Sequence, residues 1–190
     1  NKYEKWLRSK GNRETTISLL FRTLRSAYNK AIKAKCARKS DYPFDDYKIN
    51  KFDTTTQKRA IAKTDVLKFT TEVQPIGKQQ YMELSKDIFV FSYLCGGINF
   101  TDIANLTNEN IQNGRLHYIR QKTKKPIKIG IPQEAMQIIE KYSKESKGYL
   151  FPILDSKMHK TVLQKQNRIH KILGKVNKNL KLLAADLGVE

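Results

Sequence analysis

The residues best suited to chemistry on a phosphate stand in one short stretch, RQKTKK at residues 120–125. Residues 115–120 and 126–131 on either side alternate between polar and apolar types, which predicts a β-hairpin with a basic turn. Such a ribbon can enter a DNA groove, where a lysine can neutralise a phosphate or protonate a departing oxygen. A solubilising loop is the plainer interpretation, but residues 115–128 hold six basic and no acidic side chains, more than solubility requires. The turn residues expected to contact DNA are Arg120, Lys124 and Lys125.

A second basic group lies on a predicted helix over residues 14–37. Apolar residues spaced by three and four predict one buried stripe on this helix: Ile17, Leu20, Leu24, Tyr28 and Ala31. Polar and basic residues in and just before the helix lie away from that stripe and are candidates for DNA contact: Arg13, Thr15, Ser18, Arg22, Arg25, Asn29 and Lys33. A solvated helix face is the alternative. Residues 1–50 hold 13 basic and 5 acidic side chains, which favours DNA contact.

Basic residues also lie along the last predicted helix, residues 157–187, on the side opposite its apolar stripe. Residues 156–185 contain eight Lys and Arg residues and no acidic one. The candidates for DNA contact on this helix are Arg168, Lys171 and Lys175. Lys58 and Arg59 lie in a polar stretch without periodicity, and they either are solvated or follow a phosphate backbone.

Composition narrows the class of protein. The 190 residues carry a formal net charge of +19 and a pI near 9.9, which indicates a polyanionic partner, most often nucleic acid. The longest apolar run, residues 88–95, is far shorter than a membrane span, and we recognise no signal peptide, so we expect neither a membrane nor a secreted protein. Three histidines without ligand spacing and two cysteines without a CxxC pair predict no metal site. Glycine motifs that bind nucleotide phosphates are absent.

The patterns predict a mainly α protein with a small β-hairpin or sheet, an α+β fold in two parts. Residues 1–48 are helical, 49–59 form an aperiodic linker, and 60–190 form a second domain.

Within the second domain, a helix over residues 78–94 is apolar enough to be central to the core. Asn99 is expected as the N-cap of the next helix, with Asp102 close to a capping-box position. Another helix should run from Pro132 to about residue 144, and Gly174 is a candidate break in the last helix.

In this order the segments resemble the tyrosine recombinases of the phage integrase family, and within it the integrases of mobile and conjugative transposons. The similarity rests on a helical N-terminal unit with an N-x-x-T pattern, a linker ending in KRA, the segment FSYLCGGINFTDIANL at 91–106, and the QKTKKPIKIGI hairpin. The resemblance implies a helical core-binding (SAM-like) DNA-binding domain over 1–48, truncated at its N-terminus. It also implies a catalytic domain over 60–190, truncated at its C-terminus.

That family cuts DNA by attack of a tyrosine hydroxyl on a phosphodiester, which gives a 3′-phosphotyrosyl link without a metal or nucleotide cofactor. Its hairpin lysine falls on Lys122, which the resemblance makes the general acid for the 5′-oxygen. Its first catalytic arginine falls on Asn99, whose neutral amide lacks the charge and bidentate fork of a guanidinium. The second arginine box and the nucleophilic tyrosine are expected beyond this chain. We therefore expect the chain to bind double-stranded DNA and not to cleave it.

The resemblance further implies a tetramer of full-length protomers on DNA, no membrane partner, and a bacterial cytoplasm at the nucleoid. Two alternatives stay open. A non-catalytic basic DNA-binding module of the same architecture is suggested by Asn99. An RNA- or ribosome-binding protein would explain the charge, but not the two-part layout or the hairpin.

Overall fold

The chain forms two units, residues 1–60 and 61–190. The computed structural model describes residues 1–56, 61–71, 81–145 and 147–189. Lys58 and Arg59, two of the residues expected to contact DNA, lie outside the described residues.

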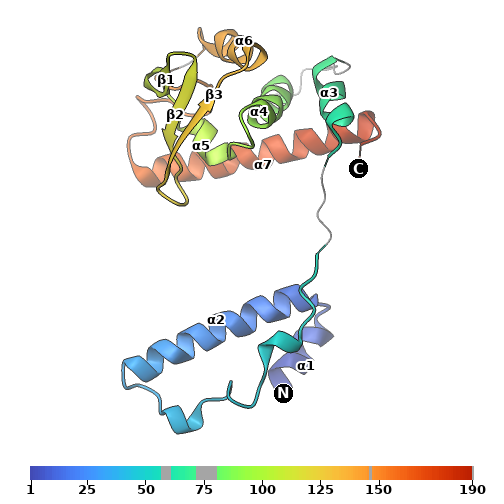
Figure 1. Ribbon diagram of the computed structural model, residues 1–190, viewed down its shortest axis with the longest axis vertical. Helices are drawn as coiled ribbons and strands as arrows, with labels where there is room; N and C mark the ends of the chain where they lie inside the picture. The colour runs from blue at the N-terminus through green and yellow to red at the C-terminus, as the bar shows by residue number, and fades with distance from the viewer. Residues whose placement is uncertain (57–60, 72–80, 146, 190) are drawn as a thin grey trace. The chain divides into compact units, whose positions relative to one another are not determined.

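Two helices and two short 3₁₀ turns build the first unit (Figure 1). In chain order they are α1 (Lys2–Ser9), α2 (Glu14–Lys33), η1 (Lys39–Asp41) and η2 (Ile49–Lys51). Asn1 caps α1, because its Oδ1 accepts a hydrogen bond from the backbone N–H of Tyr3 at 2.9 Å. The predicted helix over residues 14–37 is confirmed as α2, although it ends at Lys33. Lys35 takes a φ of +57° just after this end and turns the chain.

The core of the first unit forms where the chain after α2 returns to the helices. Its buried side chains are Leu7, Ile17, Phe21, Phe44, Ile49 and Phe52. Phe21 is central, with its ring centroid 4.7 Å from that of Tyr47 and 5.8 Å from that of Phe52. Because Ile49 and Phe52 are buried here, the first residues of the expected 49–59 linker belong to the folded unit.

The buried face of α2 differs from the predicted stripe. Ile17 is buried as expected, but Leu24 is 44% exposed, while Phe21 and Ser18 are buried. All the buried residues of α2 lie in its first half, because the core packs there. Ser18 was expected to contact DNA, and that prediction is wrong, since the residue is only 1% exposed.

An ion-pair network fastens the returning chain to α1. Glu4 accepts hydrogen bonds from Arg8 (3.1 Å), Lys51 (2.7 Å) and the Tyr47 hydroxyl (2.5 Å). Arg8 also pairs with Glu14 of α2 at 2.9 Å. Hydrogen bonds from Lys51 and Tyr47, with a further one from Arg8, lower the pKa of Glu4 to about 2. The network therefore favours the ionised carboxylate at neutral pH.

The second unit is a small sheet with helices packed around α4 (Figure 1). Its helices are α3 (Lys63–Thr71), α4 (Met82–Leu94), α5 (Phe100–Ala104), α6 (Gln133–Tyr142) and α7 (Val162–Asp186), with a 3₁₀ turn η3 (Asn108–Asn110). Its strands are β1 (Ile111–Gln112), β2 (Arg115–Ile119) and β3 (Pro126–Gly130), antiparallel in the order β1-β2-β3. The predicted hairpin is β2–β3, and β1 was not anticipated. The mainly α fold with a small β-sheet is confirmed.

Helix α4 lies at the centre of the second core, as predicted. Phe91 of α4 is fully buried, and its ring centroid lies 5.0 Å from that of Phe151. Helix α7 contributes Ile172 and Val176 to the same cluster and passes alongside α4 and α5 (Figure 1). It is continuous through Gly174, so the possible break there is not found.

Helix α7 begins at Val162 and not near residue 157. Thr161 and Gln164 form a capping box at this start, which supplies hydrogen bonds to the first turn. None of the described helices is long and apolar enough to span a membrane.

Replacing Glu4 with Gln should destabilise the first unit at pH 7 by about 1.5–3 kcal/mol, because hydrogen bonds to a charged group are lost. Since the pKa of Glu4 is lower in the folded than in the unfolded chain, its stabilisation is complete above about pH 5 and is lost as pH falls toward 2. Urea unfolding followed by the fluorescence of Trp6, the only tryptophan and part of α1, measures this unit.

The wild-type chain should lose stability between pH 5 and pH 2 more steeply than Glu4→Gln. Asp46→Asn is the matched control, because Asp46 is exposed and forms no ion pair with a described residue. Equal acid sensitivity in wild type and Glu4→Gln would contradict the role of Glu4.

Candidate nucleic-acid interface

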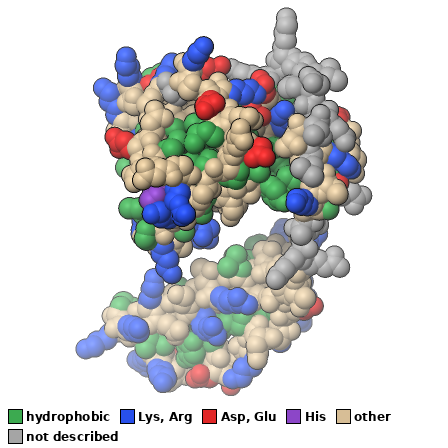
Figure 2. All heavy atoms as spheres, turned by 45° about the horizontal axis from the view of Figure 1, so that its top comes forward, with side chains coloured by type: hydrophobic (Ala, Val, Ile, Leu, Met, Phe, Trp, Pro, Cys, Tyr) green, Lys and Arg blue, Asp and Glu red, His purple; other side chains and the backbone are tan. Residues whose placement is uncertain are grey.

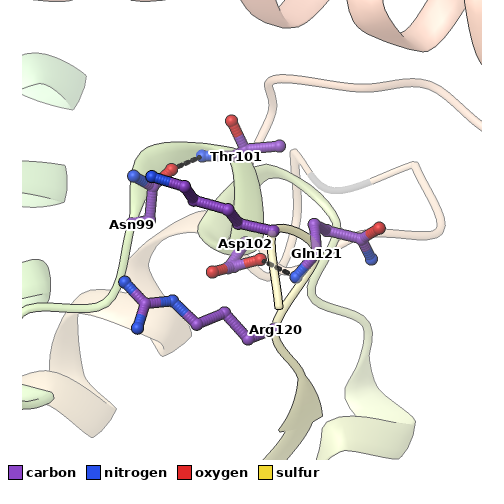
Figure 3. A pocket seen from close by; sticks show the side chains of 6 residues that line it. Asn99, Thr101, Asp102, Arg120 and Gln121 are labelled. Carbon is purple, nitrogen blue, oxygen red and sulfur yellow. Dashed lines mark hydrogen bonds between the residues drawn. The ribbon is translucent and has the colours of Figure 1, made fainter. Parts of the chain in front are cut away.

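A pocket of about 350 Å³ brings the start of α5 and the hairpin turn together. Its lining residues are Asn99, Thr101, Asp102, Arg120, Gln121 and Lys122 (Figure 3). The two residues that the family resemblance pointed to, Asn99 and Lys122, thus line one pocket although 23 positions apart in the sequence (122 minus 99). Thr101 and Gln121 were not anticipated as parts of this site.

Asn99 lines the pocket and is also the N-cap of α5. Its Oδ1 accepts a hydrogen bond from the backbone N–H of Thr101 at 2.9 Å, so the predicted N-cap is confirmed. Its amide nitrogen donates to no other described residue and can serve a bound group. Asn99 is exposed, so a ligand can reach it.

Asp102 fastens the hairpin turn to α5. Its carboxylate is buried and accepts a hydrogen bond from the backbone N–H of Gln121 at 2.8 Å (Figure 3). The expected capping-box role is not what the structure gives, because only the Asn99 side chain closes the N-terminus of α5. Asp102 therefore positions the residues that follow Gln121, including Lys122.

The turn itself is closed by its own backbone. Arg120 N–H donates to the carbonyl of Lys125 at 2.9 Å, and Lys124 N–H donates to the carbonyl of Arg120 at 2.8 Å. Lys124 takes a φ of +56°, and its Nζ reaches the Gln121 side-chain oxygen at 3.2 Å. This geometry holds Lys122 at the exposed tip of a closed turn.

The charge of the pocket is positive. Arg120 and Lys122 line it, and in Figure 3 the Arg120 guanidinium extends to the side where Asn99 lies while the Gln121 side chain points away. The only acidic lining residue, Asp102, is 5% exposed and hydrogen-bonded to backbone. Two cations beside a free amide donor suit a phosphate group.

A second hollow, of about 330 Å³, lies along the C-terminal half of α2. Its lining residues are Arg22, Arg25, Ser26, Asn29, Lys30 and Lys33. The structure thus gathers four of the α2 candidates and adds Ser26 and Lys30, which the sequence did not single out. Blue Lys and Arg side chains are prominent on the face of the first unit seen in Figure 2. Arg13 is exposed just before α2 and Thr15 is partly buried, and contact of both with DNA stays a prediction.

The α7 candidates differ from one another. Arg168 is partly buried and links α7 to two other segments. It donates from Nε to the carbonyl of Ile153 at 3.0 Å and from Nη2 to the Tyr81 hydroxyl at 3.3 Å. Lys175 lies 4.7 Å from the centroid of the Tyr81 ring. Lys171 is exposed. Of the three, Lys171 is therefore the best placed for an anion, and Arg168 is first of all a structural residue.

Other candidate chemistry finds no support in the described residues. Burial raises the pKa of Cys95 to about 11, which fits a core residue and not a nucleophile. Within the described parts of the chain, no group of three or more His, Cys, Asp and Glu side chains could hold a metal ion.

Comparison with known proteins bears on the first unit. Residues 1–50 match the family model of the Phage integrase SAM-like domain. Searches of curated proteins and of solved structures returned no match for the chain.

Asp102→Ala should loosen the hairpin turn without unfolding the unit. Loss of a hydrogen bond to a carboxylate, worth about 1.5–3 kcal/mol, should speed hydrogen exchange at the Gln121 amide by about 10- to 100-fold. Asp102→Asn keeps an acceptor oxygen and should show a smaller effect. Amide exchange followed by NMR measures the change, and the Leu116 amide in β2 reports on the rest of the sheet. An unchanged rate at Gln121 would show that Asp102 does not hold the turn.

Proposed function

We propose that this chain is the DNA-binding part of a site-specific recombinase of the tyrosine type. The observation that carries the proposal is the pocket in which Asn99 and Lys122 lie together with Arg120. The match of residues 1–50 to the Phage integrase SAM-like domain supports it independently, because it concerns the other unit.

In this proposal the pocket holds the phosphate at which DNA is cut. A tyrosine oxygen attacks phosphorus as its hydroxyl proton passes to water, the bond from phosphorus to the 5′-oxygen breaks, and Lys122 Nζ gives its proton to that oxygen. Arg120 stabilises the charge that develops on the phosphate, and the Asn99 amide donates a hydrogen bond to it. The phosphotyrosyl bond replaces the phosphodiester bond, so the strand can be rejoined without a cofactor.

Surfaces away from the pocket supply most of the affinity. Exposed Arg22, Arg25 and Lys33 on α2 would contact phosphates, as would Lys124 and Lys125 at the hairpin turn. Phosphate contacts of this kind release counterions, so the affinity should fall steeply with salt.

The attacking tyrosine is proposed to lie outside this chain. All nine tyrosines fall in described residues, and none lines the pocket. Tyr118, on the strand leading to the turn, is partly buried, and burial with the nearby Asp102 carboxylate raises its pKa, which opposes the ionised form. Tyr142 is buried and donates to Asp87 at 2.8 Å.

We extend the same proposal to three further points: a tetramer on DNA, an origin in a mobile element, and a bacterial cytoplasm.

A non-catalytic DNA-binding module is the second candidate. The observation in its favour is that Asn99 stands at the expected arginine position and uses its oxygen for the α5 cap. The two candidates share the DNA-binding surfaces and differ in whether Lys122 takes part in cleavage.

DNA binding by the chain should be strong at low salt and should weaken about 10³- to 10⁵-fold between 50 and 200 mM salt if 6–10 phosphates are contacted. Gel shifts with duplex DNA at both salt concentrations measure this. A nicked suicide substrate analysed on denaturing gels should show no covalent adduct. An adduct would contradict the proposed position of the nucleophile, and binding that prefers duplex RNA would contradict the proposal as a whole.

In a longer protein that carries the nucleophile, Lys122→Ala should slow cleavage by about 10²- to 10⁴-fold, because the leaving oxygen loses its general acid. Lys125→Ala, a matched change in the same turn, should mainly weaken binding. Single-turnover cleavage at saturating protein separates the two effects. Equal losses of binding and cleavage in Lys122→Ala would favour the non-catalytic module.

A further inference from the structure

The three-stranded sheet has one face in the core and one face in solvent. On β2, Leu116 is fully buried and Tyr118 packs against the core, so the alternating Arg115, His117 and Ile119 point the other way. The antiparallel register adds residues of β3 to the same side, since directly opposed residues share a face. The pairs are Arg115 with Gly130, His117 with Lys128, and Ile119 with Pro126. These six residues are called the outer face of the sheet.

The outer face combines unpaired charge with exposed apolar surface. Arg115 and Lys128 are exposed, and neither forms an ion pair with a described residue. None of the six residues is acidic. Ile119 is 62% exposed beside Pro126 at the end of the ribbon that leads into the turn. This combination is suited to a polyanion that also offers apolar groups.

The outer face ends at the turn that carries the cations of the pocket, and the alternation of β2 places Arg120 itself on the opposite side of the ribbon. Strand β2 runs from Arg115 to Ile119, and Arg120 of the pocket is the next residue. Four steps along a strand cover about 14 Å. That length matches about four base pairs of duplex at 3.4 Å each.

We propose that the outer face of the sheet is a further DNA-contact surface beside the hairpin turn, long enough to face about four base pairs. Arg115 and Lys128 neutralise phosphates, and Ile119 with Pro126 contacts a thymine methyl group, which RNA lacks. The inference rests on the proposed function, because duplex DNA must occupy the neighbouring pocket.

Gly130 offers a direct test. It lies opposite Arg115, its backbone φ is not in the left-handed region, and nothing lies within 4 Å of where a Cβ would stand. A glutamate there can pair with Arg115 across the strands without displacing a neighbour. Gly130→Glu therefore alters the charge of the outer face and leaves its other residues in place. Gly130→Gln, of the same shape and uncharged, is the matched control.

Fluorescence anisotropy with a duplex of about 30 base pairs, over a series of salt concentrations, measures the effect. Gly130→Glu should weaken binding at least about 10-fold and reduce the slope of log K against log salt by about one to two, because phosphate contacts are lost. Gly130→Gln adds the same bulk without the charge, so it should weaken binding less than Gly130→Glu and should not change the salt slope. The double variant Arg115→Ala with Lys128→Ala should also lower the slope by about two. Lys144→Ala, just beyond the C-terminal end of α6, should change this slope much less.

The outcomes separate the two proposals. If wild type binds DNA with a steep salt dependence but Gly130→Glu behaves like Gly130→Gln, the outer face is not a contact surface and the inference is overturned. If wild type does not bind duplex DNA, the proposed function itself fails. Equal competition by an RNA duplex in wild type also overturns the inference, because it assigns the apolar contact to DNA.

Discussion

The hydrogen bond from the Gln121 backbone N–H to the buried Asp102 carboxylate decides how the second unit presents its cations. Without it, the turn at 120–125 keeps its own two backbone bonds, but no other hydrogen bond among the described residues joins it to α5. A buried carboxylate needs partners, and a backbone amide in a basic turn is a suitable one. The same bond thus satisfies Asp102 and places Lys122 and Arg120 beside Asn99. This contact joins the two segments that line the pocket, which are far apart in sequence.

The excess of positive charge is distributed unevenly. Some cations are held by structural partners: Arg8 and Lys51 by acidic side chains, Lys141 by Glu83 and Asp87, and Arg168 by Ile153 and Tyr81. Others face solvent in groups, on α2, in the hairpin turn and on the outer face of the sheet. Grouped cations without acidic neighbours repel one another, so their proximity costs folding free energy. A bound polyanion removes that cost, which is the physical reason to look for one at each group.

Features that depend on local sequence could be predicted. The hairpin followed from alternation, and the Asn99 cap followed from a side chain placed just before an apolar helix. Features that depend on tertiary contacts could not. Burial of Ser18 depends on where the chain returns to α2, and the role of Arg168 depends on a carbonyl fifteen residues away.

The candidate site shows the same division. The basic turn and Asn99 could be found in the sequence, but their meeting in one pocket could not be derived from spacing. Asp102 carried a signal, since an acid at that position suggested a capping box. In the structure its carboxylate instead accepts a hydrogen bond from the Gln121 backbone N–H, and the Asn99 side chain caps α5. The linker boundary was missed for a related reason: Ile49 and Phe52 lie in a polar stretch, and only the aromatic core around Phe21 shows why they are buried.

Asn99 shows how one position can serve either structure or charge. An arginine there would bring a guanidinium to the pocket but would lose the cap, at a cost of about 1 kcal/mol to a helix of only five residues. Asparagine keeps the cap and still leaves its amide nitrogen free to donate. Arg120 supplies the positive charge that Asn99 lacks, because it lines the same pocket from the hairpin side. The start of α5 can therefore remain capped by Asn99 while Arg120 keeps the pocket cationic. The hydrogen bond from Gln121 to Asp102 makes this division possible, because it joins the turn to α5.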